Sequence, residues 1–273
     1  MKYAECLKSH LSGYKRYRLG VDEDGIYKKN GQAYGHILPV DLKKLNILEG
    51  IRAEFWRDLE EGKLGSVKLH TDFHHLNSSQ AMAFNLFYPF MRETGGLQLI
   101  LNAFGVARDD SGKAIFEYEP NPIEKTNFDF AIKYDDGSCV TCEVKLTESG
   151  FGTVTGEQNH QDKFRAHYEV DAARVLVPDK AEMMEFFKDY QLYRNVMHLS
   201  KNPRNYSVFL HPEANESFKE TEAKLDDALR PEYRSRAKVV HLEDLIPDLA
   251  ETAKSGVLEQ HLTGFSEKYV MPS

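Results

Sequence analysis

Two stretches near the middle of the chain alternate between large apolar side chains and small or polar ones. The first runs from residue 128 to 134 and the second from residue 140 to 146. A period of two is typical of a β-strand with one buried face. The large apolar positions are Phe128, Phe130, Ile132 and Tyr134 in the first stretch, and Val140, Cys142, Val144 and Leu146 in the second. The pattern predicts two half-buried strands that pair as a β-hairpin.

The turn between these strands determines which side chains face one another. A two-residue loop at Asp136-Gly137 would set Asp129 opposite Val144, which mixes a polar side chain with an apolar one. A three-residue loop, Asp135-Asp136-Gly137 with the glycine in the left-handed conformation, sets Asp129 opposite Glu143 instead. We therefore expect the three-residue loop and this register.

The remaining elements follow from apolar periodicity and from helix and strand breakers. The segment 114–119 reads as the first strand of the chain, because Pro120 and Pro122 end it. Ser78 or Ser79 is expected to cap a helix that closes at Pro89 and Gly95-Gly96. Further strands are expected over 205–211 and 237–242, and further helices over 42–61, 183–199 and 245–262.

The expected hairpin brings two carboxylates together. Asp129 and Glu143 would repel each other across the strand pair unless a cation lies between them. Mg²⁺ is suited to such a pair, because it binds through one or two carboxylates and keeps positions for water and phosphate oxygens. Lys145 shares the face of Glu143 and can orient or deprotonate a water, or stabilise developing charge. The chemistry that this set indicates is phosphodiester hydrolysis.

The spacing Asp129-x13-Glu143-Val144-Lys145 resembles the PD-(D/E)XK nuclease superfamily, although Phe128 stands where the family usually has proline. The segment from His74 to Ala81, together with 85–87, also resembles the N-terminal motif of a restriction-endonuclease-like subfamily. The matched segments span about residues 74–211. The resemblance implies an α/β fold with a restriction-endonuclease-like core, a mixed β-sheet flanked by helices.

The resemblance also implies roles for individual residues. Asp129, Glu143 and the backbone carbonyl of Val144 would hold Mg²⁺, with Mn²⁺ as a substitute, and Lys145 would act on the attacking water. Gln191, in the motif 191–195, is expected in the catalytic set. Many of these nucleases carry a further upstream acid, for which the nearest candidates are Glu119, the favoured metal ligand, and Glu93. Gln80 and Arg194 are expected to touch nucleic acid, against the alternatives of a structural Gln80 and a solvated Arg194.

Charge bears on the expected substrate. The formal net charge of −8 is unfavourable for DNA binding, but the 35 Lys and Arg residues can still gather on one side of the molecule. Lys15, Arg16 and Arg18, interleaved with Tyr17, form the clearest basic cluster and are expected to contact nucleic acid. The alternative is a solvated basic turn.

Composition indicates how the chain is divided into domains and argues against a membrane, secreted or cysteine-rich protein. No Pro/Gly/Ser-rich linker divides the 273 residues, so residues 1–273 are expected to form one domain, with extensions before and after the core. There is no membrane-spanning run, and the first residues lack a signal-peptide core, which predicts a cytoplasmic protein. Three cysteines make neither a disulfide framework nor a zinc site.

These observations predict a Mg²⁺-dependent nuclease, endo- or exo-acting, that hydrolyses phosphodiester bonds of DNA in defence or DNA processing. Two alternatives remain open. One is a nucleic-acid-binding or scaffold protein of the same fold without catalysis, and the other is a hydrolase of RNA or a small phosphodiester. Cutting both strands of a duplex usually needs two sites, which favours a homodimer.

Overall fold

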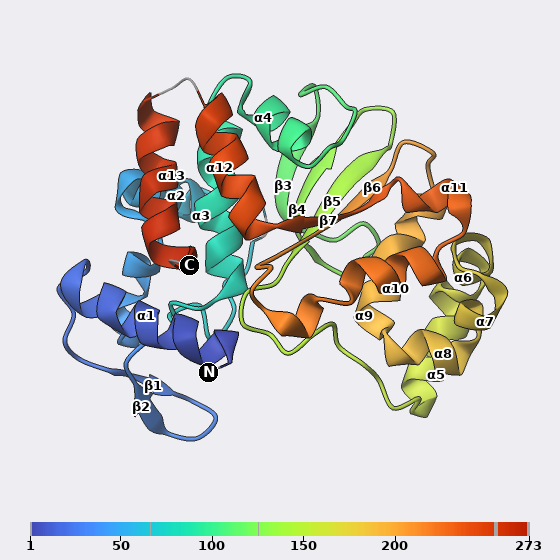
Figure 1. Ribbon diagram of the computed structural model, residues 1–273, viewed down its shortest axis with the longest axis horizontal. Coiled ribbons are helices and arrows are strands. Elements are labelled where there is room, and N and C mark those ends of the chain that lie inside the picture. The colour runs from blue at the N-terminus through green and yellow to red at the C-terminus, as the bar shows by residue number, and fades with distance from the viewer. Residues whose placement is uncertain (1, 66, 125, 254–255, 272–273) are drawn as a thin grey trace.

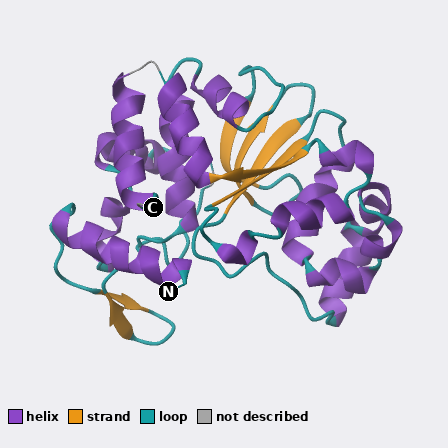
Figure 2. Ribbon diagram, viewed as in Figure 1, coloured by secondary structure: helices purple, strands orange, loops and turns teal. Residues whose placement is uncertain are grey.

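A five-stranded mixed sheet lies at the centre of the computed structural model, which describes residues 2–65, 67–124, 126–253 and 256–271 (Figure 1). The strand order is β3-β4-β5-β6-β7, antiparallel from β3 to β5 and parallel from β5 to β7. The strands are β3 (Lys113–Tyr118), β4 (Phe128–Lys133), β5 (Cys139–Val144), β6 (Tyr206–His211) and β7 (Ala237–His241). Helices pack on both sides of the sheet (Figure 2). The expected fold, a mixed sheet flanked by helices as in restriction endonucleases, is confirmed.

The hairpin of β4 and β5 has the expected register. Phe130 pairs with Cys142, and Ile132 pairs with Val140. The Tyr134 N–H donates to the Ser138 carbonyl at 2.9 Å, which leaves a three-residue loop between them. Gly137 in that loop has φ +77°, a left-handed conformation that glycine adopts without steric cost.

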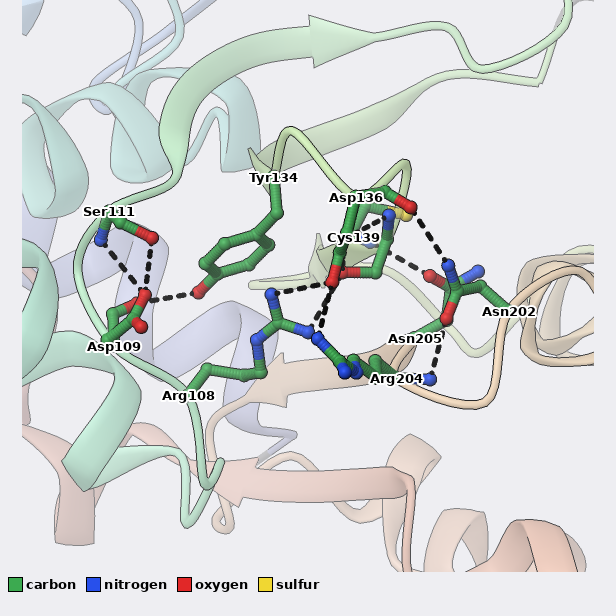
Figure 3. Close-up of polar contacts among 10 residues, drawn as sticks. Arg108, Asp109, Ser111, Tyr134, Asp136, Cys139, Asn202, Arg204 and Asn205 are labelled. Atoms are coloured by element: carbon green, nitrogen blue, oxygen red, sulfur yellow. Dashed lines mark hydrogen bonds and ion pairs between the residues drawn. The ribbon is translucent and has the colours of Figure 1, made fainter.

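Polar contacts fix this turn to the rest of the molecule (Figure 3). Asp136 accepts a hydrogen bond from the Ser138 amide at 2.8 Å and one from Arg204 at 2.9 Å. The Ser138 hydroxyl and amide, with Arg108 and Arg204 nearby, lower the pKa of Asp136 to about 2. The Arg108 guanidinium also lies 3.7 Å from the centre of the Tyr134 ring. The register that places the carboxylates at the far end of the hairpin is therefore anchored at the turn.

One face of the sheet packs against helices from both ends of the chain. The Phe87 ring of the central helix in this layer stacks on Phe130 of β4, with the ring centroids 4.1 Å apart. This layer contains α1 (Tyr3–Tyr17), α2 (Glu49–Glu60), α3 (Ser79–Arg92), α4 (Gly96–Ala103), α12 (Leu242–Thr252) and α13 (Gly256–Tyr269). A 3₁₀ helix (Val40–Asn46) precedes α2.

The second layer consists mostly of short helices between β5 and β7. Its core surrounds Phe186 and Tyr190 and includes Phe209 of β6. The helices are α5 (Gln158–His167), α6 (Glu169–Val175), α7 (Pro178–Ala181), α8 (Met183–Lys188), α9 (Tyr190–Val196), α10 (Thr221–Ala228) and α11 (Pro231–Arg234), with 3₁₀ turns at Met197–Ser200 and Glu216–Phe218. Side chains on alternate positions of β4 and β5 face this layer, and the candidate site lies among them.

Several expected helices are interrupted. The segment 42–61 breaks at Ile47 and Leu48, which are extended, and 183–199 breaks at Asp189. The segment 245–262 divides into α12 and α13, with residues 254 and 255 outside the described part. The prediction that 114–119 is the first strand is wrong, because β1 (Gly25–Tyr27) and β2 (Gln32–Tyr34) form an earlier small hairpin.

The helix that Ser78 caps runs further than expected. The Ser78 side chain accepts from the Ala81 N–H, as expected for an N-cap, but α3 continues through Pro89 to Arg92. Proline lacks the N–H that would bond to the Asn85 carbonyl. The His261 Nε2 of α13 lies 2.6 Å from that carbonyl oxygen and replaces the missing donor. A contact from a distant helix therefore makes this proline tolerable.

Candidate active site

Asp129 and Glu143 lie at the end of the hairpin away from the turn. Asp129 is the second residue of β4, and Glu143 is the fifth of β5. The observed register, continued by one residue, sets the two opposite each other. Asp129 Oδ2 accepts a hydrogen bond from the Val144 N–H at 2.7 Å, which holds the carboxylate against β5. The structure thus brings together the two carboxylates that the sequence pairs.

Glu143 is the centre of a compact polar cluster. Lys145 Nζ donates to Glu143 Oε1 at 2.8 Å, and Gln191 Nε2 donates to the same oxygen at 2.6 Å. Glu143 is 5% exposed and Lys145 is 9% exposed, so their ion pair is largely shielded from water. Three of the residues expected in the catalytic set therefore meet at one oxygen atom.

The glycine-rich loop after β5 holds Gln191 in place. The Gly152 N–H donates to Gln191 Oε1 at 3.3 Å, and the Gln191 N–H donates to the Gly152 carbonyl at 3.1 Å. Because the amide oxygen accepts from Gly152, the amide nitrogen is the group directed at Glu143. The ring centroid of Phe151, in the same loop, lies 5.8 Å from Lys145 Nζ. The loop therefore covers the lysine and orients the glutamine.

The charges in this cluster perturb one another. Burial raises the pKa of Asp129 well above its usual range, and the neighbouring Glu143 raises it further, against the opposing effects of Lys145 and the Val144 amide. Burial lowers the pKa of Lys145, but Glu143 and Asp129 outweigh it, so the pKa of Lys145 is raised. Lys145 is therefore an ammonium at neutral pH, and Asp129 tends to retain a proton where no cation is present.

These residues suit a hard divalent cation. A cation beside Asp129 and Glu143 would stabilise the charged form of Asp129, which burial and the neighbouring Glu143 disfavour. In the part of the chain that the structure describes, no three His, Cys, Asp or Glu side chains are grouped to share one ion. Two carboxylates with a carbonyl such as that of Val144, completed by water, match the way Mg²⁺ binds to proteins.

The further acids expected from the sequence, Glu119 and Glu93, are both exposed. Glu119 follows the end of β3, and Glu93 caps the C-terminus of α3. The acid next to Asp129 is Glu117, whose charge contributes to the raised pKa of Asp129. Glu117 faces Asp129 because Phe116 pairs with Phe130 and Tyr118 pairs with Phe128. Pairing β3 with β4 through their phenylalanines is the sequence signal that would have identified it.

Gln80 has a structural role in place of the expected contact with nucleic acid. It is 1% exposed, its Oε1 accepts from the His70 N–H, and its Nε2 donates to the Lys68 carbonyl and to Glu117 Oε1. A buried amide with both ends engaged is not available to a phosphate. Gln80 instead connects α3 to Glu117.

Lys15 is likewise not available to nucleic acid. Its side chain is fully buried, and its ammonium donates to the Glu23 carbonyl at 2.6 Å, Asp24 Oδ1 at 2.7 Å and the Ile37 carbonyl at 3.3 Å. The basic cluster is therefore smaller than its sequence suggests, because one of its cations is internal.

The other expected nucleic-acid contacts are more accessible. Arg16 and Arg18 are half exposed or more, with Arg18 paired to Glu267. Arg194 is partly exposed beside the Tyr190 ring, on the same helix as Gln191. Contact of these three arginines with nucleic acid stays a prediction.

Lys15→Ala is expected to lower the free energy of unfolding by about 3 kcal/mol, because it leaves Asp24 and two carbonyls without their buried cation. Arg16→Ala, one residue along the same helix, is expected to change it by less than about 0.5 kcal/mol. Urea denaturation of the two variants measures the difference. Equal midpoints would contradict the structural role of Lys15.

The mixed sheet flanked by helices, with an Asp, a Glu and a Lys at the end of its central hairpin, defines a restriction-endonuclease-like protein. The sequence matches the family described as Restriction Endonuclease associating with ARP over residues 8–270, and the chain belongs to this family. Membership points to a nuclease-type function. No curated protein and no solved structure matches the chain. No helix in the described ranges is long and apolar enough to cross a membrane.

Proposed function

We propose that this protein is a Mg²⁺-dependent nuclease that hydrolyses phosphodiester bonds of DNA. The observation that carries the proposal is the convergence of Lys145 and Gln191 on Glu143, beside Asp129. A buried lysine, a glutamine and two carboxylates are costly to bring together for stability alone. They suit a site that binds a cation and a phosphate group.

Asp129, Glu143 and the Val144 carbonyl would hold the ion. Mg²⁺, or Mn²⁺ in its place, polarises phosphate oxygens and lowers the pKa of a bound water. Lys145, whose pKa is raised, acts as a hydrogen-bond donor to the attacking water or the developing negative charge. Gly152 holds the Gln191 side chain in place. The side-chain N–H group of Gln191 can then exchange its hydrogen bond to Glu143 for one to a water or a phosphate oxygen.

DNA is the proposed substrate, because the chain belongs to a restriction endonuclease family. Arg194, three residues beyond Gln191 on α9, is proposed to contact the DNA backbone. A role in defence or DNA processing, a cytoplasmic location and a homodimer are parts of the same proposal. The polar cluster around Glu143 gives no reason to favour an inactive scaffold.

Incubation of the purified chain with linear duplex, circular duplex and single-stranded DNA, and with RNA, tests the proposal. We expect cleavage of DNA with Mg²⁺ or Mn²⁺ and none with EDTA. Cleavage of circular DNA would identify an endonuclease. Cleavage of RNA without cleavage of DNA would contradict the proposal that DNA is the substrate. Cleavage that EDTA leaves unchanged would contradict the metal requirement.

A further inference from the structure

The hairpin of β1 and β2 projects from the rest of the molecule. Figure 2 shows it at the lower left as a two-stranded ribbon that extends beyond the helices of its layer. Every residue from Lys28 to Ala33 is exposed, and Ile26 is 56% exposed. A hairpin of two strands is only marginally stable in water, because it has no core of its own. Its position therefore favours a contact surface over a role in stability.

Hydrogen bonds hold the tip of this hairpin in one conformation. The Gly31 N–H donates to the Tyr27 carbonyl at 2.8 Å, and Gly31 has φ +71°. The Tyr34 hydroxyl donates to Gln32 Oε1 at 2.9 Å and accepts from Asn30 Nδ2 at 2.8 Å. A tip that is already ordered loses little conformational entropy when it binds a partner. The tip therefore suits recognition of a second molecule.

The tip is basic in a chain whose net charge is −8. Lys28 and Lys29 carry its charge, since residues 25–35 contain no Asp or Glu. Neither lysine is within ion-pair distance of an acidic side chain in the described ranges, and Lys29 Nζ lies 5.9 Å from the centre of the Tyr27 ring. Two exposed cations without acidic partners are complementary to the phosphates of a nucleic acid.

The base of the hairpin is joined to the border of the candidate active site. Ile37, just after β2, pairs with His75 in an antiparallel bridge. Two residues further along, Asn77 Nδ2 donates to Thr147 Oγ1 at 2.8 Å. Thr147 is itself two residues beyond Lys145. The hairpin is thus fixed to the loop that follows the proposed catalytic lysine, so a long ligand such as a duplex can contact both.

We propose that the β1–β2 hairpin is a DNA-binding arm that enters the major groove of the duplex that the candidate site cleaves. This inference rests on the proposed function, which supplies the duplex. The major groove is wide enough to admit a two-stranded β-ribbon. Lys28 and Lys29 contact phosphates and position the arm. The side-chain N–H group of Gln32, which has no acceptor among the described residues, donates to base edges.

Binding of the full-length protein to a short duplex in EDTA tests the role of the lysines. Lys28→Ala combined with Lys29→Ala is expected to weaken binding about tenfold, because two phosphate contacts are lost. The slope of log affinity against log salt concentration should fall by about two. Lys113→Ala combined with Lys133→Ala is the matched control, because these exposed lysines pair across β3 and β4 at the far end of the sheet. Its affinity should stay within about twofold of that of the wild type.

A shortened hairpin tests the place of the tip in the groove. Asn-Gly in place of residues 28–31 joins Tyr27 to Gln32, which pair in the ribbon, by a two-residue turn. Dimethyl sulfate methylates N7 of guanine, which the major groove exposes. At saturating concentration, the wild type is expected to protect guanines that the shortened variant leaves reactive. No protection by the wild type, or the same pattern for both proteins, would contradict insertion into the major groove. Melting curves establish that the variant is folded.

The outcomes separate this inference from the proposed function. If the wild type cleaves DNA with Mg²⁺ but the two double variants bind the duplex equally well, the role of the hairpin is overturned while the nuclease stands. If the wild type neither binds nor cleaves duplex DNA, both are overturned.

Discussion

Lys145→Ala is expected to cleave DNA about 10² to 10⁴ times more slowly than the wild type while still binding Mn²⁺. Lys145 supplies a buried ammonium beside Glu143, and its raised pKa keeps it charged at neutral pH. That charge acts on the attacking water or the transition state, whereas the ion itself is held by the carboxylates. The rate under saturating Mg²⁺ and the affinity for Mn²⁺ are the two measurements.

Lys133→Ala is the matched control, because Lys133 is an exposed lysine on β4 and should be dispensable for cleavage. Lys145→Gln is a second variant, which keeps a donor near Glu143 and loses the charge. Melting curves establish that each variant is folded. Cleavage by Lys145→Ala at the wild-type rate would remove Lys145 from the catalytic set.

Asp129→Asn is expected to stabilise the metal-free protein and to weaken its response to Mg²⁺. Burial and Glu143 raise the pKa of Asp129, so the charged carboxylate is unfavourable in the folded state. Asparagine keeps an acceptor for the Val144 N–H and removes the charge. In EDTA at neutral pH we expect the free energy of unfolding to increase by about 0.5 to 2 kcal/mol, as is common when an unfavourable functional residue is replaced. At the same concentration, Mg²⁺ should raise the melting temperature of the wild type more than that of Asp129→Asn.

The difference in stability between Asp129→Asn and the wild type should depend on pH, in the direction that the raised pKa of Asp129 sets. A carboxyl group whose pKa is raised by folding contributes stability below its unfolded pKa, and this contribution is lost as the pH rises through the folded pKa. The advantage of Asp129→Asn should therefore appear as the pH rises and vanish in acid. Asp135→Asn, in the exposed hairpin turn, is the control. An Asp129→Asn variant that melts below the wild type throughout this range would contradict the account.

Local patterns in the sequence were sufficient to predict the central hairpin and its polar cluster. Alternation identified β4 and β5, and the loop ending at Gly137 selected the register that sets Asp129 opposite Glu143. These features depend on residues close together in the chain. The sequence motif identifies Gln191. The orientation of its side chain depends on Gly152, which is distant in the chain, and so it follows only from the structure.

The features that the sequence did not reveal depend on distant contacts or on unusual backbone. Pro89 predicts a helix end, because the contact with His261 that compensates for its missing N–H joins residues far apart in the chain. The sequence predicts a surface cation at Lys15, because its acceptors Asp24 and Ile37 lie outside the local basic pattern. The place of Glu117 beside Asp129 is not predicted from the hairpin alone, because it depends on the pairing of Phe116 with Phe130 across β3 and β4.

The rate of DNA cleavage as a function of Mg²⁺ concentration, measured in parallel for the wild type, Asp129→Asn and Lys145→Ala, is the most direct test of the proposed active site. We expect high Mg²⁺ to partly restore cleavage by Asp129→Asn, which binds the ion weakly, and to do little for Lys145→Ala, whose missing charge the ion does not replace. Equal rates for all three proteins, or a wild-type rate that does not depend on Mg²⁺, would contradict it.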